Sequence, residues 1–114
     1  MAGSGLKGIQ GGAVIHTSDE TDDLVSVIMP CYRGDDPLAL AAAIGSVLDQ
    51  TYSNLELIVS IDGPISEALN TAIVEAVDER CRVISSPENC GPAAARNRAV
   101  KQCSGHYIAL AVLT

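Results

Sequence analysis

Aromatic side chains are nearly absent from this sequence: its 114 residues include three Tyr, no Phe and no Trp. Hydrophobic residues nevertheless make up 47% of the chain, so the core must be aliphatic and built from Val, Ile, Leu and Ala. This hydrophobic content argues for a folded chain rather than a disordered one. The length allows one domain at most, and a small one for a sheet covered on both faces.

Basic residues are also scarce. Seven Lys and Arg stand against 14 Asp and Glu, which gives a formal net charge of -7 at pH 7. Duplex nucleic acids need a basic protein face, so this charge argues against a nucleic-acid partner. It does not exclude a single bound nucleotide, because a local site can oppose the global charge.

The cysteines and the apolar runs exclude further classes of protein. No CxxC pair occurs and no signal peptide precedes the cysteines, which argues against a disulfide framework and against a structural metal site. No apolar run is long enough to span a bilayer. We therefore expect a cytoplasmic protein with small, buried or half-buried thiols in a reducing compartment. The thiols are Cys31, Cys81, Cys90 and Cys103.

Familiar nucleotide-binding and nucleophile motifs are missing too. The segment after Met29 has one glycine, Gly34, instead of the GxGxxG that brings backbone against a pyrophosphate, and there is no Walker sequence. No Ser-His-Asp or Cys-His arrangement is visible. His106 is expected to be structural or solvent-facing, and His16 an incidental solvated residue.

The stretch Leu55 to Pro64, LELIVSIDGP, is the pattern around which the rest of the chain is organised. A continuous apolar run bounded by turn residues is typical of a strand buried on both faces of a parallel sheet. Asp62 would lie at the carboxyl end of that strand, where ligands bind in open α/β sheets. On this pattern alone, Asp62 is interpreted equally well as the cap of a turn or as a ligand contact.

The other segments predict alternating strands and helices. Residues 1–23, rich in Gly and Ser, are expected to form a flexible tail. A strand over residues 24–29 should stop at Pro30, which cannot donate to a sheet ladder. The remaining strands are predicted at residues 82–85 and 106–114, and the helices at residues 37–50, from Ser66 onward, and from Pro92 to about Cys103.

The helix signals are local. Asp36 followed by Pro37 predicts an N-cap and a first helical residue, and Pro92 repeats the proline signal. We expect Gly45 to allow close packing on the sheet and Gly105 to end the last helix as a left-handed C-cap. The order β-α-β-α-β-α-β predicts an α/β fold, a Rossmann-like three-layer α/β/α arrangement with a mostly parallel sheet.

Three segments taken together resemble the amino-terminal half of a family 2 glycosyltransferase with the GT-A fold. They are VSVIMPCYRG, SVLDQTYSNLELIVSIDGP and PENCGPAAARNRAVKQCSGHYIAL, which cover residues 24–110 in the family's order and spacing. The resemblance implies that residues 24–114 are a partial GT-A domain that binds the nucleotide of an activated sugar, commonly UDP. It also implies transfer of a hexose-type sugar to a saccharide or lipid-linked acceptor, in polysaccharide or cell-envelope glycan synthesis, in the cytoplasm or peripherally at the inner face of the membrane.

The resemblance assigns nucleotide-binding roles to residues of two strand ends. Pro30 and Tyr32 match the loop that lines the base, where a tyrosine ring packs on uracil and excludes water. Asp62 matches the aspartate that accepts a hydrogen bond from uracil. A carboxylate suits that role because N3 of uracil is a donor, whereas the unprotonated N3 of cytosine is an acceptor. The family often has two consecutive aspartates here, and this chain has Ile61 before Asp62.

A third segment matches the family pattern NxGxxxARN. Glycine in this pattern lets the loop approach the ligand, and the arginine offers a charged fork suited to phosphate or carboxylate. The alternative for Arg96 is a salt bridge within the fold. The matching residues are Asn89, Gly91, Ala95, Arg96 and Asn97.

The sequence departs from the family after Ala111. Family members carry an acidic triplet there, whose carboxylates hold Mg²⁺ or Mn²⁺ beside the diphosphate. The acidic positions fall on Val112 and Thr114 in this chain, and neither side chain can hold a hard cation as a carboxylate does. The resemblance also places the acceptor half and its general base beyond the matched segments, so we expect this chain to have no catalytic or metal-binding residues.

We therefore expect a truncated chain that is inactive in sugar transfer and at most binds a nucleotide. Two alternatives stay open: a truncated or frame-shifted product without catalysis, and a structural fragment that needs a partner chain. In the second case, a sheet edge and helix faces left exposed by the truncation would favour self-association.

Overall fold

Four strands of the computed structural model form one sheet, in the order β5-β4-β3-β6, and each neighbouring pair is parallel. The structure describes residues 8–9, 13–14, 23–50 and 52–111. The sheet and its helices are, in chain order, β3 (Val25–Tyr32), α1 (Pro37–Leu48), β4 (Leu55–Asp62), α2 (Glu67–Ala76), β5 (Cys81–Ser86), α3 (Pro92–Val100) and β6 (Tyr107–Leu110).

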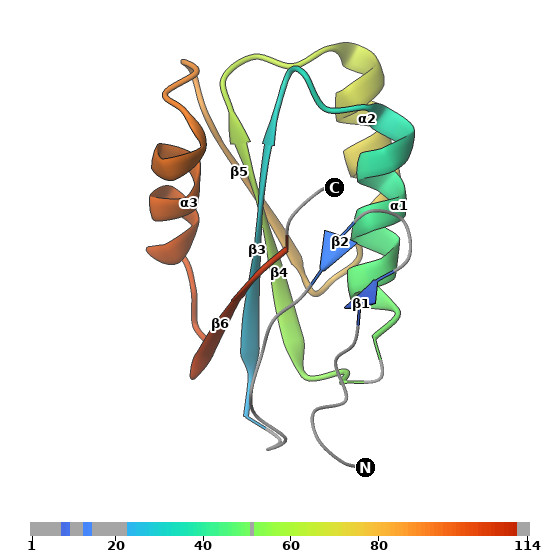
Figure 1. The fold of residues 1–114 in the computed structure, drawn as a ribbon, viewed down its shortest axis with the longest axis vertical. Helices are drawn as coiled ribbons and strands as arrows, with labels where there is room; N and C mark the ends of the chain where they lie inside the picture. Colours follow the sequence, from blue (N-terminus) through green and yellow to red (C-terminus); the bar gives the residue numbers. More distant parts are fainter. Residues whose placement is uncertain (1–7, 10–12, 15–22, 51, 112–114) are drawn as a thin grey trace.

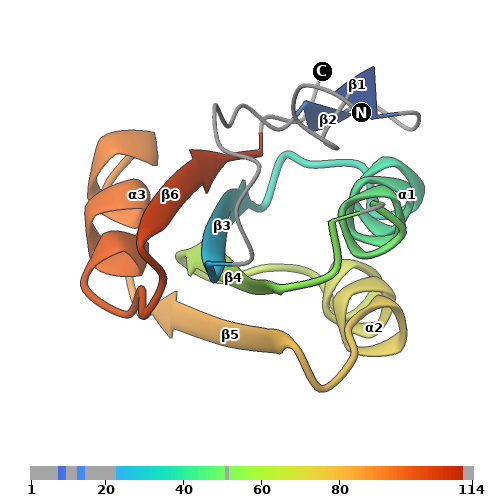
Figure 2. The ribbon, with the colours of Figure 1, turned by 90° about the horizontal axis from the view of Figure 1, so that it is seen from below.

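The expected α/β fold with a Rossmann-like, parallel sheet is confirmed. Helices α1 and α2 lie on one face of the sheet and α3 lies on the other, as Figures 1 and 2 show. Strands β1 (Gly8–Ile9) and β2 (Ala13–Val14) pair with each other and form an antiparallel ribbon. Most of the expected flexible tail lies outside the described residues, so its flexibility stays a prediction.

The core is aliphatic, as the composition requires. Its larger cluster joins the sheet to α1 and α2 and includes Ile44 of α1 and Ile73 of α2, which are 0% and 1% exposed. A smaller cluster, centred on Ile28, Ile58 and Ala99, joins the other face to α3. Strand β4 is therefore covered on both faces, which explains why all of its residues except Glu56 are buried.

The helix starts lie where the sequence predicts them. The Asp36 carboxylate accepts a hydrogen bond from the Ala39 backbone N–H at 2.9 Å, and Pro37 is the first helical residue. The Ser66 hydroxyl accepts one from the Leu69 backbone N–H at 3.1 Å at the start of α2. Hydrogen bonds to a side chain three residues away therefore mark where both helices begin.

Pro30 does not end the first strand, which corrects one prediction. Strand β3 continues through it to Tyr32. The carbonyl of Ile28 accepts a hydrogen bond from the backbone N–H of Ala111, so the even-numbered backbone groups of β3 face β6. The pairing with β6 runs from Val25 to Ile28, and within the described residues Pro30 therefore removes no ladder bond.

Two predictions about glycines are wrong. A methyl group on Gly45 would meet nothing within 4 Å, so this glycine is not needed for packing on the sheet. Gly105 does not adopt the left-handed conformation of a C-cap. Its Cβ would instead lie 2.6 Å from the carbonyl oxygen of Leu24, so close approach of the chain before β6 to the start of β3 explains the glycine.

The element boundaries differ from expectation by a few residues. Helix α1 ends at Leu48 and α3 at Val100, and β5 is longer than predicted because it pairs with β4 over its whole length. Strand β6 ends at Leu110 among the described residues, and residues 112–114 of the predicted last strand lie outside them. Within the described ranges, none of the helices combines the length and the apolar character that a membrane crossing needs.

Candidate nucleotide-binding site

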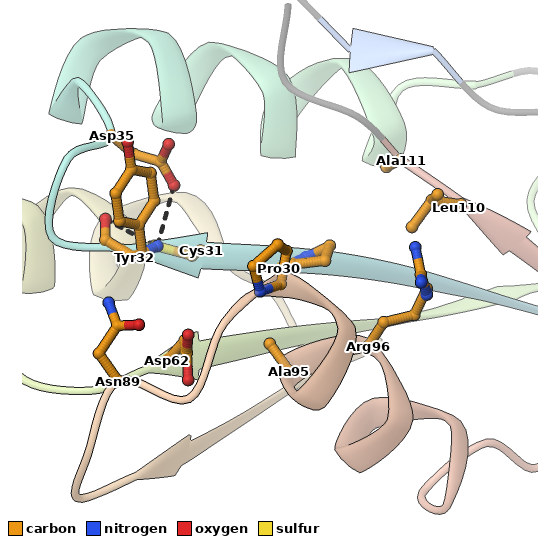
Figure 3. Close-up of a pocket in the computed structure, with 11 residues that line it drawn as sticks. Pro30, Cys31, Tyr32, Asp35, Asp62, Asn89, Ala95, Arg96, Leu110 and Ala111 are labelled. Carbon is orange, nitrogen blue, oxygen red and sulfur yellow. Dashed lines mark hydrogen bonds between the residues drawn. The ribbon is translucent and has the colours of Figure 1, made fainter.

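A cavity of about 590 Å³ opens at the carboxyl ends of the strands. The chain leaves β3 toward β4 on one side and returns to its other side as β6, so the topological switch point of the sheet lies between β3 and β6. Ligands of open α/β sheets bind at this point. The lining residues, most of them labelled in Figure 3, are Pro30, Cys31, Tyr32, Asp35, Asp62, Asn89, Pro92, Ala95, Arg96, Leu110 and Ala111.

The sequence-predicted residues come together here. Pro30 and Tyr32 on β3, Asp62 at the end of β4, Asn89 after β5 and Arg96 on α3 all line the cavity. Gly91 does not line it but contacts Asp62 through its backbone N–H. Segments separated along the chain therefore meet at one end of the sheet. This placement is a prerequisite of the nucleotide-binding roles and does not test them.

Asp62 is the most constrained polar residue of the site. Its side chain is 4% exposed, and its two carboxylate oxygens accept hydrogen bonds from the backbone N–H groups of Cys90 (2.9 Å) and Gly91 (2.7 Å). The Arg98 guanidinium lies 3.8 Å from Oδ1. A carboxylate this buried requires such partners. Asp62 therefore anchors the loop that follows β5, a role that pattern reasoning did not foresee.

Two glycines shape the backbone beside Asp62. Gly63 has φ +86°, and a Cβ on it would lie 2.8 Å from the backbone nitrogen of Asn89. Gly91 has φ +99° and is the N-cap of α3, with Pro92 at the first helical position. Both conformations are strained for residues with a side chain. They bring the end of β4 and the loop before α3 into direct contact.

Tyr32 lies at the cavity, with its side chain half exposed. Its backbone N–H donates to the Asp35 carboxylate at 3.0 Å, and the Asp35 N–H donates back to the Tyr32 carbonyl at 3.1 Å, which closes a tight turn (Figure 3). A Cβ on Gly34 would lie 2.4 Å from the Tyr32 hydroxyl oxygen. The absence of a side chain at Gly34 therefore lets the ring fold back over the turn.

Arg96 and Asn89 supply exposed polar groups. Figure 3 shows the Arg96 side chain extending toward Leu110 from α3. In the part of the chain that the structure describes, no ion pair involves Arg96. The alternative of a salt bridge within the fold therefore finds no support among these residues. A guanidinium without a carboxylate partner can bind an anionic group of a ligand.

Cys31 is a lining residue that sequence reasoning did not assign to the site. Its side chain is 2% exposed, and burial, with a smaller effect of the nearby Asp35 carboxylate, raises the pKa of its thiol to about 12. The thiol therefore stays protonated at neutral pH and is a poor nucleophile. It contributes apolar surface to the cavity rather than reactivity.

Other contributors were missed because their signals are tertiary. Leu110 and Ala111 follow from the position of β6, and Asp35, which precedes the helix cap Asp36, was not singled out by any motif. Arg98 could have been found from helical spacing, because it follows Ala95 by three residues and therefore lies next to the buried side of α3.

The described residues do not fit a catalytic divalent cation. No group of three or more His, Cys, Asp and Glu side chains among them could hold a metal ion. The two carboxylates of the cavity, Asp35 and Asp62, already accept backbone hydrogen bonds. Val112 and Thr114, which occupy the family's acidic positions, lie outside the described residues, so the expected lack of a metal site stays a prediction.

The fold and the cavity define a class: a Rossmann-like α/β domain with a cavity at the switch point of its parallel sheet, the position at which ligands of open α/β sheets bind. The sequence model described as "Glycosyl transferase family 2" matches residues 26–111. The chain belongs to this family. The resemblance noted from the motifs is thereby confirmed.

Curated relatives agree with this assignment. The UDP-Glc:alpha-D-GlcNAc-diphosphoundecaprenol beta-1,3-glucosyltransferase WfgD of Escherichia coli is 41% identical over 88 residues, which are 77% of this chain and 34% of the relative. The putative teichuronic acid biosynthesis glycosyltransferase TuaG of Bacillus subtilis is 36% identical over 88 residues, or 75% and 34% of the two chains. This chain thus spans about a third of the length of these relatives.

Proposed function

We propose that this chain is the nucleotide-sugar-binding part of a glycosyltransferase and that its cavity binds the nucleoside diphosphate of the donor. The observation that carries the proposal is the position of Asp62, a buried and anchored carboxylate at the rim of a cavity at the switch point of the sheet. The names of the relatives support a UDP-sugar donor and an acceptor in cell-envelope glycan synthesis. The location in the cytoplasm stays a prediction.

The base is proposed to lie between Tyr32 and Asp62. Tyr32 offers an aromatic ring beside the cavity, and Asp62 offers carboxylate lone pairs that its two backbone contacts leave unused. A carboxylate accepts the N3–H of uracil and repels the N3 lone pair of cytosine. Base selectivity for uracil is therefore the expected property of the site.

The diphosphate is proposed to lie toward Arg96 on α3. The guanidinium can donate two parallel hydrogen bonds to phosphate oxygens. Asn89 lies on the same loop as the anchored Gly91 and adds a neutral donor at the cavity. Both side chains are exposed in the free protein, so their polar groups are accessible to a ligand.

Calorimetric titration with UDP tests the proposal. Wild-type protein is compared with Asp62→Ala and with the matched control Glu56→Ala, which removes a carboxylate from the other end of the same strand. Asp62→Ala should weaken UDP binding about ten-fold or more, the effect of losing a charge-assisted contact. Glu56→Ala should leave the affinity unchanged. Equal affinities of wild type and Asp62→Ala would remove Asp62 from the site, and circular dichroism verifies that each variant is folded.

A second candidate function is nucleotide binding without sugar transfer by this polypeptide alone. It is supported by Val112 and Thr114, which stand at the family's acidic positions and carry no carboxylate. Incubation with radiolabelled UDP-sugar and Mg²⁺ or Mn²⁺ should then give no metal-dependent turnover, although UDP binds. Metal-dependent release of UDP by this polypeptide would contradict it.

A further inference from the structure

Asp62 receives a third contact, from the residue Arg98 that neither the motif nor the cavity lining singles out. Arg98 Nη2 lies 3.8 Å from Asp62 Oδ1, and the two side chains are 27% and 4% exposed. Arg98 lies on α3, whereas the N–H groups that bind Asp62 lie in the loop before it. The carboxylate is thus contacted from both the loop and the helix.

The environment of Arg98 indicates that its position serves Asp62. Its Nη1 is buried and has no hydrogen-bond partner among the described residues. A buried donor without a partner is unfavourable, so the side chain is not held there by its own hydrogen bonds. Its one ion pair in the described part of the chain is with Asp62. Attraction to this carboxylate is therefore the interaction that compensates the burial of the guanidinium.

The contact has a geometric consequence for the base site. Hydrogen bonds from two backbone N–H groups still allow the carboxylate to rotate by small angles about its Cβ–Cγ bond, since each of them tolerates a range of acceptor angles. A cation on the Oδ1 side restricts that motion.

We propose that Arg98 is a positioning residue for nucleotide recognition. It holds the Asp62 carboxylate in the orientation that both fixes the loop at Cys90 and Gly91 and presents a lone pair to the N3–H of uracil. This inference rests on the proposed function and deepens it, because it assigns uracil selectivity to a pair of residues rather than to Asp62 alone. Arg98 itself does not touch the nucleotide.

The test uses the whole polypeptide and compares UDP with CDP. Arg98→Met removes the charge and keeps much of the apolar stem, and Arg98→Lys keeps a charge. Arg82→Met is the matched control, because Arg82 pairs with Glu56 at 3.7 Å at the opposite end of β4. Should Arg98→Met not fold, Arg98→Gln takes its place in every measurement.

The expected result is a loss of selectivity. Arg98→Met should weaken UDP binding about ten-fold and CDP binding much less, so that the ratio of the two dissociation constants narrows. Arg98→Lys should restore most of that ratio, and Arg82→Met should change neither constant. A ratio equal to that of the wild type in Arg98→Met would overturn the proposal, as would an equal loss for both nucleotides, which indicates general damage to the loop.

Amide hydrogen exchange in the free protein separates this proposal from the proposed function. If Asp62 depends on Arg98, the Cys90 and Gly91 amides should exchange faster in Arg98→Met than in wild type or Arg82→Met. Unchanged exchange of these two amides in Arg98→Met would contradict the positioning role of Arg98. Failure of the wild type to bind UDP would refute the proposed function and with it the selectivity role, while faster exchange would still establish the anchoring role of Arg98.

Discussion

Strand β4 carries a carboxylate at each end, and the two ends are built alike. At the amino end, Glu56 Oε2 accepts a hydrogen bond from the Ser104 backbone N–H at 2.6 Å. At the carboxyl end, Asp62 accepts such bonds from the loop before α3. Each carboxylate also has an arginine nearby, at 3.7 Å for Glu56 and 3.8 Å for Asp62. At each end of β4, a carboxylate therefore attaches a loop that is distant in the sequence to the sheet.

The ends differ in what surrounds the carboxylate. At the amino end, the Ser26 hydroxyl donates to Glu56 at 2.6 Å and accepts from the Gly105 N–H at 2.8 Å, so the loop before β6 closes directly on β3. At the carboxyl end, described residues of β3 and of the segment that follows β6 line a cavity together with Asp62. The anchor at the carboxyl end therefore lies at the candidate site, whereas the anchor at the amino end holds the loop before β6 against β3.

The largest effect should come from Gly63→Ala. The new methyl group would adopt an unfavourable φ of +86° and lie 2.8 Å from the Asn89 nitrogen, a backbone atom that cannot move alone. We expect a loss of about 3 kcal/mol in the free energy of unfolding, measured by urea denaturation, together with weaker UDP binding. If the carboxyl end tolerated this change, its proposed rigidity would be disproved.

Gly45→Ala is the matched control for that measurement. A methyl group there meets nothing within 4 Å and replaces a glycine in the middle of α1. It should stabilise the protein by about 0.5–1 kcal/mol and leave UDP binding unchanged. Similar losses for the two glycines would mean that the effect comes from glycine replacement in general.

The next largest effect is expected from replacing two buried serines, one near each end of the sheet. Ser26→Ala removes a donor to Glu56 and leaves the Gly105 N–H without its acceptor, so we expect about 2 kcal/mol of destabilisation and unchanged UDP affinity. Ser60 near the carboxyl end makes one bond, to the Ala95 carbonyl at 2.8 Å, and Ser60→Ala should lose about 1 kcal/mol. Urea denaturation measures the stability of both variants, and calorimetry measures their affinity for UDP. The proposed difference between the two ends would be contradicted if Ser26→Ala weakened UDP binding more than Ser60→Ala.

Local patterns predicted most of the fold. The buried strand Leu55–Asp62 follows from its apolar run, and the helix starts at Asp36 and Ser66 follow from capping residues within three positions of the groups they bind. The strand beyond Pro30 and the need for Gly105 could not be predicted in this way. Both depend on where β6 lies beside β3, and that information comes from contacts between distant segments.

The same limit applies to the candidate site. The motifs predicted that Tyr32, Asp62 and Arg96 lie at one end of the sheet, because the carboxyl ends of parallel strands lie together. They could not show that the Asp62 carboxylate is occupied by N–H groups 28 and 29 residues further along the chain. The two roles predicted for Asp62, a turn cap or a ligand contact, therefore did not include the one that the structure shows. Asp62 anchors another loop and also lines the cavity.

Cys31 gives a smaller, pH-dependent effect at the carboxyl end. Burial raises the pKa of its thiol from an ordinary value of 9.0 to about 12. Below pH 9 the thiol is protonated in both states, whereas between pH 9 and 12 it ionises only in the unfolded chain. The free energy of unfolding should therefore fall with rising pH in this window, by about 1 kcal/mol per unit from this group.

The measurement for Cys31 is the difference between wild type and Cys31→Ala in urea denaturation from pH 7 to 10.5. The two curves should run parallel up to pH 8 and converge above pH 9, because the variant lacks the group that penalises folding there. Parallel curves over the whole range would mean that the thiol ionises in the folded protein as easily as in the unfolded chain, and the carboxyl end would then be more open around Cys31 than its exposure of 2% indicates.

The smallest effect should come from Gly34→Ala, which acts on the ring of Tyr32 alone. Its Cβ would lie 2.4 Å from the Tyr32 hydroxyl oxygen, and the ring can swing away while the backbone stays in place. We expect stability within about 0.5 kcal/mol of wild type but UDP binding about three-fold weaker, since the ring no longer lies where it packs on the base. Calorimetry in a Tyr32→Leu background is the control, because Gly34→Ala should have no further effect once the ring is gone. A three-fold loss in that background as well would show that the turn, rather than the aromatic ring, contacts the nucleotide.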